Sequence, residues 1–217
     1  MTEEMLLKLA QAVVDGNPEV AEKMVSEALV QGVDPLICLN KGLTVGIARV
    51  GELFAIGDYY LPDLIAGAMA MKAALSVLEP ALVKAGRERK VLGRVVLGTV
   101  KGDQHDIGKT LVGIMLTANG FLVTDIGVDK PVADFVSAAK DTNATLVGAS
   151  ALLTTTMLQQ QHIVQEFEKA GLRPKVKVIV GGAPVTKSWA EKINADGFAE
   201  DAVAAVALAK MLLGHQT

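Results

Sequence analysis

Asp103 and His105 are the two residues of this chain whose types and spacing best suit metal chemistry. They lie in the run Gly102-Asp-Gln-His-Asp-Ile-Gly-Lys109, between an apolar stretch of strand type, Val95 to Val100, and an apolar stretch of helical type, Leu111 to Leu116. A histidine two residues after a carboxylate can ligate a metal through one ring nitrogen while the carboxylate holds the other. That second bond fixes the tautomer and raises the basicity of the ligating nitrogen. The run therefore predicts a metal ligand, His105, on a strand-to-helix turn.

The surroundings of His105 distinguish it from an ordinary loop histidine, which is usually structural or solvated. Gly108 lets the start of the following helix lie close to a bulky ligand, because glycine has no side chain. The other two histidines lack this setting. His162 falls on a polar helix face among three glutamines (159–161), and His215 lies in the C-terminal tail. We interpret both as structural or solvated residues.

Two further motifs end later strand-like runs. Ser150-Ala-Leu-Leu-Thr-Thr-Thr156 could cap the next helix, but four hydroxyls exceed what a cap needs, and they could reach a nucleotide-like tail or Asp103. Gly181-Gly-Ala-Pro184 would allow the backbone to approach a flat ligand group. A dinucleotide site is not expected, because no Gly-x-Gly-x-x-Gly follows the first strand. No Gly-x-x-x-x-Gly-Lys-Ser/Thr is present either, which excludes a phosphate-binding loop of that type.

Composition restricts the class of protein. The 217 residues are 51% apolar, with few aromatic side chains and 21 glycines, which suits close helix-strand packing. The net charge of −3 has no basic block, so we do not expect nucleic acid as a partner. The only cysteine, Cys38, excludes a disulfide framework within the chain. No signal peptide is evident, and no apolar run approaches the roughly 20 residues that span a bilayer. We therefore expect a soluble, cytoplasmic protein without a membrane partner.

Residues 1 to 86 have helical periodicity only and predict a four-helix bundle. Asn17-Pro18 and Asp34-Pro35 each place a capping side chain before a proline at the first helical position. The polar stretch Lys84–Lys90 reads as a linker and a hinge. The predicted helices are an initial one containing Leu6 to Val13, followed by Pro18–Gln31, Pro35–Phe54 and Leu61–Lys84.

Residues 90 to 217 alternate strand-like and helical stretches. The strands are almost continuous apolar runs, as expected for a parallel sheet covered on both faces. We predict a flavodoxin-like (Rossmann-like), doubly wound sheet of five strands, with its ligand beyond the carboxyl ends of the strands. The predicted strands are 91–100, 121–126, 144–151, 176–180 and a short one near 197–199. The predicted helices are 107–118, 132–141, 156–170, 187–194 and 201–213.

Five motifs, taken together and in order, resemble one known family over almost the whole chain. They are Val50-Gly-Glu-Leu-Phe54, Tyr59-Tyr-Leu-Pro-Asp63, the Gly98–Lys109 run that contains His105, Gly148-Ala-Ser-Ala-Leu-Leu-Thr-Thr-Thr-Met157, and Val180-Gly-Gly-Ala-Pro184. The chain resembles the corrinoid (B12-binding) methyl-carrier proteins of methylotrophic methyltransferase systems, which serve methanol, methylamines, betaines or aryl methyl ethers. It is similar also to the cobalamin module of methionine synthase. The resemblance implies a helical cap, residues 1–86, before a cobalamin-binding domain, residues 90–217.

This resemblance implies a cobalamin or related corrinoid bound in a base-off, His-on form, with His105 beneath the cobalt. His105, Asp103 and Thr156 match the histidine, aspartate and serine of the linked triad in methionine synthase, with threonine replacing serine. Tyr60 stands where the family cap usually presents a phenylalanine over the upper cobalt face. The implied cofactor-binding residues, which include those along the displaced nucleotide tail, are Gly102, Asp103, Gln104, His105, Asp106, Ile107, Gly108, Ser150, Leu152, Thr154, Gly181, Gly182, Ala202 and Tyr60.

The function implied is that of a methyl carrier in one-carbon metabolism, a subunit rather than a complete catalyst. It would accept a methyl group from a substrate-specific methyltransferase and deliver it to a second methyltransferase, whose acceptor is coenzyme M or tetrahydrofolate. A reductive activase would be a third partner. One alternative is the cobalamin module of an adenosylcobalamin mutase, which would not need the helical cap. Another is a B12-dependent sensor or regulator, which would need a DNA-binding domain. A flavodoxin-like domain without a cofactor is the remaining alternative.

Overall fold

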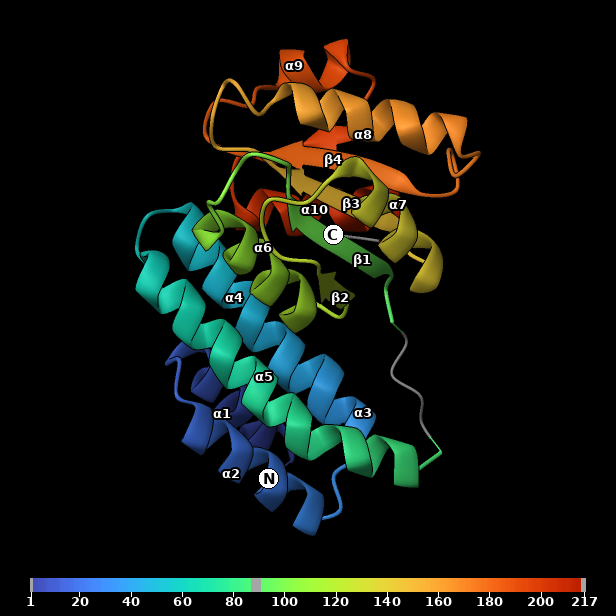
Figure 1. The fold of residues 1–217 in the computed structure, drawn as a ribbon. Coiled ribbons are helices and arrows are strands. Elements are labelled where there is room, and N and C mark those ends of the chain that lie inside the picture. Colours follow the sequence, from blue (N-terminus) through green and yellow to red (C-terminus); the bar gives the residue numbers. More distant parts are fainter. Residues whose placement is uncertain (1, 87–90, 216–217) are drawn as a thin grey trace. The chain divides into compact units, whose positions relative to one another are not determined.

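The chain forms two compact units, one within residues 1–90 and one within 91–217 (Figure 1). The computed structural model describes residues 2–86 and 91–215. The described part of the first unit is helical, and that of the second is a sheet with helices on both faces, so the predicted fold class is confirmed. The predicted linker and hinge fall largely on residues 87–90, which lie outside the described residues.

The helical unit follows the predicted pattern with one difference. The segment predicted as a single helix over Pro35–Phe54 is three successive helical stretches without a break, the middle one a π-helical turn. Such a turn inserts extra backbone into a helix and locally changes which side chains face the core. The elements are α1 (Thr2–Val14), α2 (Pro18–Val30), α3 (Pro35–Ile37), η1 (Cys38–Leu43), α4 (Thr44–Ala55) and α5 (Leu61–Lys84).

Local chemistry explains how this unit closes. The side chain of Asn17 accepts a hydrogen bond from Val20 N–H at 3.1 Å, which caps α2 as its position before a proline predicts. A Cβ atom at Gly46 of α4 would lie 2.5 Å from the carbonyl oxygen of Ala10 in α1. Only glycine therefore permits the close approach of these two helices.

Helix α5 corrects one expectation from the sequence. It is long and apolar enough to cross a membrane by length and composition alone, the one such helix among residues 2–86 and 91–215. Its apolar residues include Leu64, Met71 and Leu78, which are fully or almost fully buried, and α5 packs along α2. The apolar run that the sequence was expected to lack is thus present as the core helix of this unit.

The second unit alternates strands and helices at nearly the predicted bounds. Helices α6 and α7 begin and end at the predicted residues, and the strand bounds lie within three residues of the predicted ones, with β4 extending one residue beyond its predicted end. The elements are β1 (Arg94–Thr99), α6 (Ile107–Ala118), β2 (Leu122–Asp125), α7 (Val132–Asp141), β3 (Leu146–Ser150), α8 (Leu158–Lys169), β4 (Lys177–Gly181), α9 (Lys187–Lys192), β5 (Gly197–Phe198) and α10 (Ala202–Leu212).

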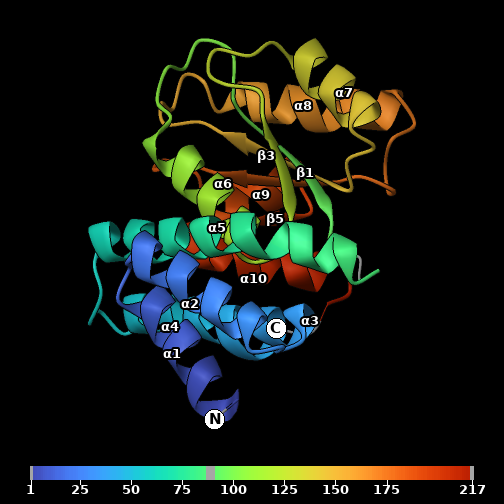
Figure 2. The same ribbon diagram turned by 90° about the horizontal axis from the view of Figure 1, so that it is seen from below.

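The sheet is parallel throughout, with strand order β2-β1-β3-β4-β5. Helices α6 and α10 pack together on one face, and α7 and α8 on the other (Figure 2). Phe135 and Phe167 are fully buried between the sheet and α7 and α8. The chain winds in one direction from β1 to β2 and in the other from β2 to β3 and onward. The helices that follow the neighbouring strands β1 and β3, α6 and α8, therefore lie on opposite faces of the sheet, and the loops that lead to them start side by side at its carboxyl edge. This switch point is where ligands of such folds bind.

Candidate functional site

The loops that follow β1 and β3 come together at the switch point. Thr99 and Ser150, the last residues of the two strands, are paired in the sheet, and Val100 N–H donates to the Ser150 carbonyl at 3.0 Å. The first loop carries Asp103 and His105, and the second carries Thr156. Residues about fifty positions apart in the sequence therefore share one edge of the sheet, as the sequence analysis requires.

Asp103 is the centre of this site. Its side chain is fully buried, and its two oxygens accept five hydrogen bonds. Oδ1 accepts from His105, through the backbone N–H at 3.1 Å and ring Nδ1 at 2.7 Å. Oδ2 accepts from Leu152 N–H at 2.7 Å, from Leu153 N–H at 3.2 Å and from Thr156 Oγ1 at 2.8 Å. A buried carboxylate is tolerated when its lone pairs are satisfied in this way.

These bonds determine the charge of Asp103 and the tautomer of His105. Burial alone would raise the pKa of Asp103, but the hydrogen bonds from His105, Thr156 and the backbone outweigh it and hold that pKa well below its usual range. Asp103 is therefore ionised at neutral pH and cannot donate. Nδ1 of His105 must then carry the ring proton, which leaves the lone pair of Nε2 for a metal.

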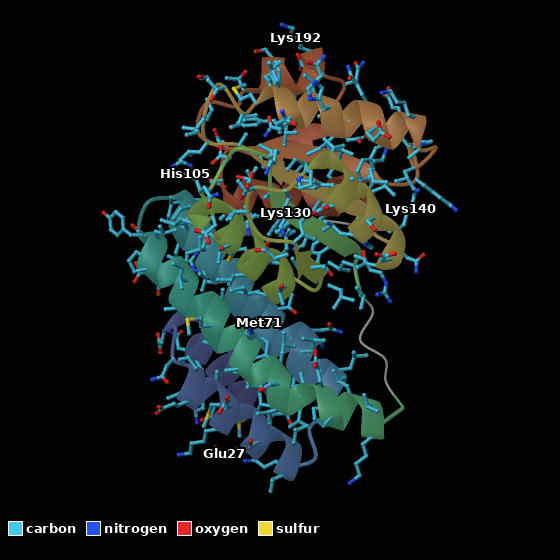
Figure 3. All side chains as sticks on the ribbon, viewed as in Figure 1. Glu27, Met71, His105, Lys130, Lys140 and Lys192 are labelled. Carbon is cyan, nitrogen blue, oxygen red and sulfur yellow. The ribbon has the colours of Figure 1, made fainter. Side chains whose placement is uncertain are left out.

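The rest of His105 is arranged for a ligand outside the protein. Its side chain is 52% exposed, although Asp103 behind it is buried. Thr99 Oγ1 donates to the His105 carbonyl at 2.8 Å and so holds the backbone of the loop against the end of β1. Figure 3 shows His105 at the edge of the α/β unit, on the turn that leads into α6. The imidazole is held from behind and presented to solvent.

The residues present fit a large planar group that brings its own metal ligands. Among the described residues, no set of three or more His, Cys, Asp or Glu side chains is placed to hold a metal ion. A metal at Nε2 would thus take its other ligands from a cofactor. Three apolar residues near this site are exposed to solvent. Ile107 (75%) follows His105 by two positions, and Leu153 (42%) and Leu152 (39%) donate their backbone N–H groups to Asp103.

Gly108 supports the same interpretation. A Cβ atom at this position would meet no other protein atom within 4 Å. The packing of the protein therefore does not require glycine here, and the backbone conformation does not require it either. The space beside α6 remains available to a ligand, as the sequence predicts.

Thr156 stands where the resemblance to methionine synthase would place a serine, and its hydroxyl forms the hydrogen bond expected of that serine. Its hydroxyl reaches Asp103 in spite of the added methyl group, which lies 3.6 Å from where a Cβ of Gly102 would be. Thr156 Oγ1 also lies 2.9 Å from the Leu153 carbonyl, so its single proton has two acceptors. The predicted chain His105–Asp103–Thr156 is present as a hydrogen-bonded unit.

The residues predicted to line the nucleotide tail lie in three places: at and after the end of β3, at and after the end of β4, and at the start of α10. No hydrogen bond that the structure describes joins them to Asp103, His105 or Thr156. Ser150 and Gly181 end β3 and β4 as paired residues, and Thr154 is exposed. Ala202 begins α10 with its side chain 3% exposed. Gly182 has φ +125°, and a Cβ there would lie 1.8 Å from the Ala151 carbonyl oxygen. Gly182 is thus required by the protein backbone itself, whatever the ligand.

Sequence reasoning misplaced Gln160 and missed its role. The predicted polar face around His162 is only partly polar, because Gln160 is fully buried. Its Nε2 donates to the carbonyls of Ala149 and Gly181, at 2.9 and 3.1 Å, and its Oε1 accepts from Trp189 Nε1 at 3.0 Å. Gln160 of α8 therefore holds the carboxyl ends of β3 and β4 together through one side-chain amide. Three consecutive glutamines gave no signal as to which of them turns inward.

Lys109 was named in the motif without a role. Its side chain is 4% exposed and forms an ion pair with Asp125, at the end of β2. Asp125 also accepts from Gly127 N–H at 2.8 Å. The pair fixes the first turn of α6, which follows His105, to the neighbouring strand. Asp129 braces the loop before His105 in a comparable way, through contacts given below.

Two further predicted residues lie away from this cluster. His215 Nε2 lies 2.6 Å from the Leu92 carbonyl, so the tail histidine links the end of the chain to the start of β1. Tyr60 precedes α5 in the helical unit, where its N–H donates to Asp63 Oδ2 at 2.9 Å, and it is 70% exposed. Its predicted place over the cobalt stays a prediction.

Comparison with known proteins agrees with this geometry. Two family models match, each described as a B12 binding domain, over residues 93–207 and residues 5–79. The chain is 44% identical to the trimethylamine corrinoid protein of Methanosarcina barkeri over 211 residues, 97% of each chain. It is 46% identical to dimethylamine corrinoid protein 1 of Methanosarcina mazei, again over 97% of each. Among solved structures, the methanol:cobalamin methyltransferase complex MtaBC from Methanosarcina barkeri matches with a TM-score of 0.87 and 27% identity, covering 99% of this chain and 81% of that one.

Proposed function

The chain belongs to the B12-binding corrinoid proteins, and from that premise we propose that it carries a methyl group on a corrinoid cobalt held by His105. The observation that carries the proposal is the bond from His105 Nδ1 to the ionised, buried Asp103, which presents Nε2 as a metal ligand. The cofactor would be bound base-off and His-on, with Asp103 and Thr156 behind the ligand. When bound, the corrinoid supplies a cobalt that can accept a methyl group and release it again.

The chain's own residues would orient the ligand and supply or withdraw charge at Nε2. Asp103 keeps the proton on Nδ1 and increases the basicity of Nε2, which favours ligation. A proton that reached the Asp103–His105 pair from solvent, directly or relayed through the Thr156 hydroxyl, would reduce that basicity and weaken ligation. The same three residues could thus adjust the axial ligand to the two halves of a transfer cycle.

We further propose the partners. A substrate-specific methyltransferase would load the methyl group, and a second methyltransferase, with coenzyme M or tetrahydrofolate as acceptor, would remove it. A reductive activase would restore the reactive cobalt state. The names of the relatives make methylamines the first donors to test. The helical unit, with Tyr60, would shield the bound methyl group between these encounters.

The test of His-on binding is spectroscopic. The full-length protein is loaded with cobalamin, reduced to the cobalt(II) state, and examined by EPR and optical absorption. We expect hyperfine coupling to one axial imidazole nitrogen, and its loss in His105→Ala. Axial water or benzimidazole in the wild-type protein would refute the ligand assignment.

The test of methyl transfer uses the same holo-protein after a chemical reductant has taken the cobalt to the cobalt(I) state, which can accept the methyl group. It is offered to trimethylamine, dimethylamine and methanol methyltransferases with their substrates, and methylation of the corrinoid is followed optically. A methylamine enzyme should methylate it fastest. Methylation by none of the three would contradict the proposed class of donor and leave the cofactor assignment to the EPR result.

A further inference from the structure

We propose that Asp129, in the loop between β2 and α7, is a positioning residue that determines how firmly His105 ligates the corrinoid. The inference rests on the proposed function, since it concerns the loop that carries the ligand. Asp129 was not marked out by any sequence motif considered above. Its side chain is only partly buried, and it lies 24 positions after His105 in the chain.

Asp129 contacts each of three consecutive residues that lead to the ligand. Its Oδ1 accepts from Gly102 N–H at 2.8 Å. Its carboxylate lies 3.0 Å from Lys101 Nζ. Its own backbone N–H donates to the Asp103 carbonyl at 2.9 Å. Asp129 thus binds the Gly102 N–H and the Asp103 carbonyl, which lie at the two ends of the turn that positions the Asp103 side chain. The Asp103 side chain in turn positions His105.

The loop that carries Asp129 is itself fastened to β1 beyond the end of β2. Thr99 N–H donates to the Gly127 carbonyl, and Lys130 N–H donates to the Thr99 carbonyl, each at 3.0 Å. Val100 and Lys130 form an isolated parallel bridge. Lys130, labelled with His105 in Figure 3, marks this loop. Asp129 therefore contacts the His105 loop from a segment whose own backbone is hydrogen-bonded to β1 on both sides of it.

The backbone conformation at the contact indicates which side chains could replace Asp129. Asp129 has φ +55° and Gly102 has φ +84°, so both lie in the left-handed region. Aspartate and asparagine tolerate this region better than most residues, and glycine tolerates it freely. Asp129→Gly therefore removes the carboxylate without adding backbone strain. Asp129→Asn keeps an acceptor for Gly102 N–H and removes the charge.

The bond to Gly102 rather than the ion pair is expected to carry the effect. The Lys101 and Asp129 side chains are 56% and 34% exposed, and exposed ion pairs contribute little. A hydrogen bond from a backbone N–H to a carboxylate is stronger than a neutral one, and it acts directly on the turn. Asp129→Asn keeps a weaker, neutral acceptor for Gly102 N–H, whereas Asp129→Gly keeps none, so the asparagine variant should lose less.

The experiment uses full-length holo-protein in the cobalt(II) state. EPR gives the fraction with axial imidazole, and titration of the cofactor-free protein with cobalamin gives the affinity. Asp129→Gly should lower the affinity for cobalamin about threefold to tenfold. This is less than the roughly 10- to 100-fold typical of residues that hydrogen-bond directly to a metal-ligating side chain, because Asp129 acts through the backbone of the loop. It should also reduce the imidazole-ligated fraction. Asp129→Asn should stay within about twofold of the wild type.

A matched control and a second readout separate positioning from general stability. Asn143 has φ +51° in the turn between α7 and β3, at the amino end of that strand, so Asn143→Gly makes the same change away from the site. It should leave the EPR signal and the affinity unchanged. In the cofactor-free protein, hydrogen exchange at the Gly102 amide should be faster in Asp129→Gly and unchanged in Asn143→Gly.

The outcomes distinguish this inference from the proposed function. A wild-type protein without axial imidazole overturns the proposed function. If the wild-type protein shows axial imidazole and Asp129→Gly keeps the same imidazole-ligated fraction and the same affinity, only the positioning role is overturned. An equal loss in Asp129→Asn and Asp129→Gly would also overturn it, because the Gly102 bond would then not be the cause.

Discussion

At the scale of single residues, the site depends on a carboxylate that has no access to water but has five donors. Both oxygens of Asp103 accept hydrogen bonds, and the donors lie on two loops. Three of the donors are backbone N–H groups, which only a proline substitution would remove. The same arrangement makes Asp103 intolerant of replacement. A side chain that placed its own donor opposite one of these N–H groups would leave both donors without an acceptor in a buried site.

Asp103→Asn should therefore affect both ligation and stability. An amide that accepts from Leu152 and Thr156 must turn its NH2 toward His105, which favours the tautomer with the proton on Nε2. We expect corrinoid affinity to fall about 10- to 100-fold and stability to fall by about 1–3 kcal/mol, because His105 N–H loses its acceptor. Titration with cobalamin and denaturant unfolding measure the two effects. His105→Ala should lose ligation. It removes one of the five donors to Asp103 but keeps the backbone N–H of residue 105, so it should cost less stability than Asp103→Asn, and equal destabilisation in both variants would contradict this account.

Gly108 and Gly182 offer a second contrast at this scale. Gly108→Ala meets no protein atom within 4 Å and improves helix propensity, so the cofactor-free protein should be as stable as the wild type or up to about 1 kcal/mol more stable. Its affinity for corrinoid should nevertheless fall. Gly182→Ala, at φ +125° and 1.8 Å from a carbonyl oxygen, should destabilise the cofactor-free protein by several kcal/mol. Thermal unfolding with and without cobalamin distinguishes the two, and unchanged cobalamin affinity in Gly108→Ala would show that the space beside α6 is not used.

At the scale of elements, the helix that follows the ligand is held by a buried cation. Lys109 lies in the first turn of α6, and its partner Asp125 ends β2 with its side chain 38% exposed. Removing one partner of a buried pair leaves the other uncompensated. Because Asp125 can still reach water, the cost should be smaller than for a fully buried pair.

Lys109→Met should thus destabilise the α/β unit by about 1–3 kcal/mol, in line with a partly exposed ion pair whose stem remains packed. Lys101→Met is the matched control, since it breaks an ion pair with Asp129 whose cation is 56% exposed. It should change stability little. Denaturant unfolding of the two cofactor-free variants measures the difference. If Lys101→Met costs as much as Lys109→Met, burial of the cation is not what matters.

Cys38, which begins the π-helical turn, makes the helical unit sensitive to alkaline pH. Burial, with a smaller contribution from Asp34, raises the pKa of its thiol to about 11. An unfolded chain releases this proton near pH 8.5. Between these values the folded state holds more protons, so stability falls as pH rises through that window and is unaffected below it. Cys38→Ala should flatten the slope of unfolding free energy against pH above about 8.5.

Thiol labelling checks the same residue independently. Because Cys38 is the only cysteine, the labelling rate needs no assignment. At pH 8 we expect slow labelling that follows unfolding and becomes fast only in denaturant. Rapid labelling of the native protein would show that the turn at Cys38 opens on its own.

At the scale of the whole molecule, each unit has its own buried core. The hydrogen bonds described for the Asp103, His105 and Thr156 side chains all join residues of the second unit. All residues predicted to bind the nucleotide tail also lie beyond residue 90. The helical unit contributes Tyr60 alone to the predicted site.

A truncated chain beginning near Glu88 should therefore fold and bind corrinoid, and it measures how the two units divide their tasks. Its affinity should be equal or somewhat weaker, and after methylation its cobalt–carbon bond should photolyse faster than in the full chain. The reason is that a shielding helical unit returns the methyl radical to the metal before it escapes. Equal photolysis rates would show that the helical unit does not cover the methyl group and would leave it as a docking unit for methyltransferases.

The sequence by itself determined the repeating elements and the ligand motif. The apolar runs and their helical or strand period depend on neighbours within a few residues, so nearly all bounds in residues 91–215 could be predicted. The π-helical turn could not, because its extra residue shifts the phase of the apolar pattern at one point only and leaves the helical period on either side unchanged. The spacing of Asp103 and His105 is equally local, and it sufficed to predict their hydrogen bond.

Thr156 is the one distant partner of Asp103 that the resemblance implied, and only the tertiary structure decided the others. Asp103 meets Leu152 and Thr156 because strand order β2-β1-β3 brings two carboxyl ends together. Gln160 and Asp129 become part of the site through backbone groups, whose positions depend on the fold and leave no mark in residue types. A hydrogen bond to a backbone N–H or carbonyl can be made to any residue. The sequence therefore names the ligand, while the packing of the sheet selects the residues that hold it in place.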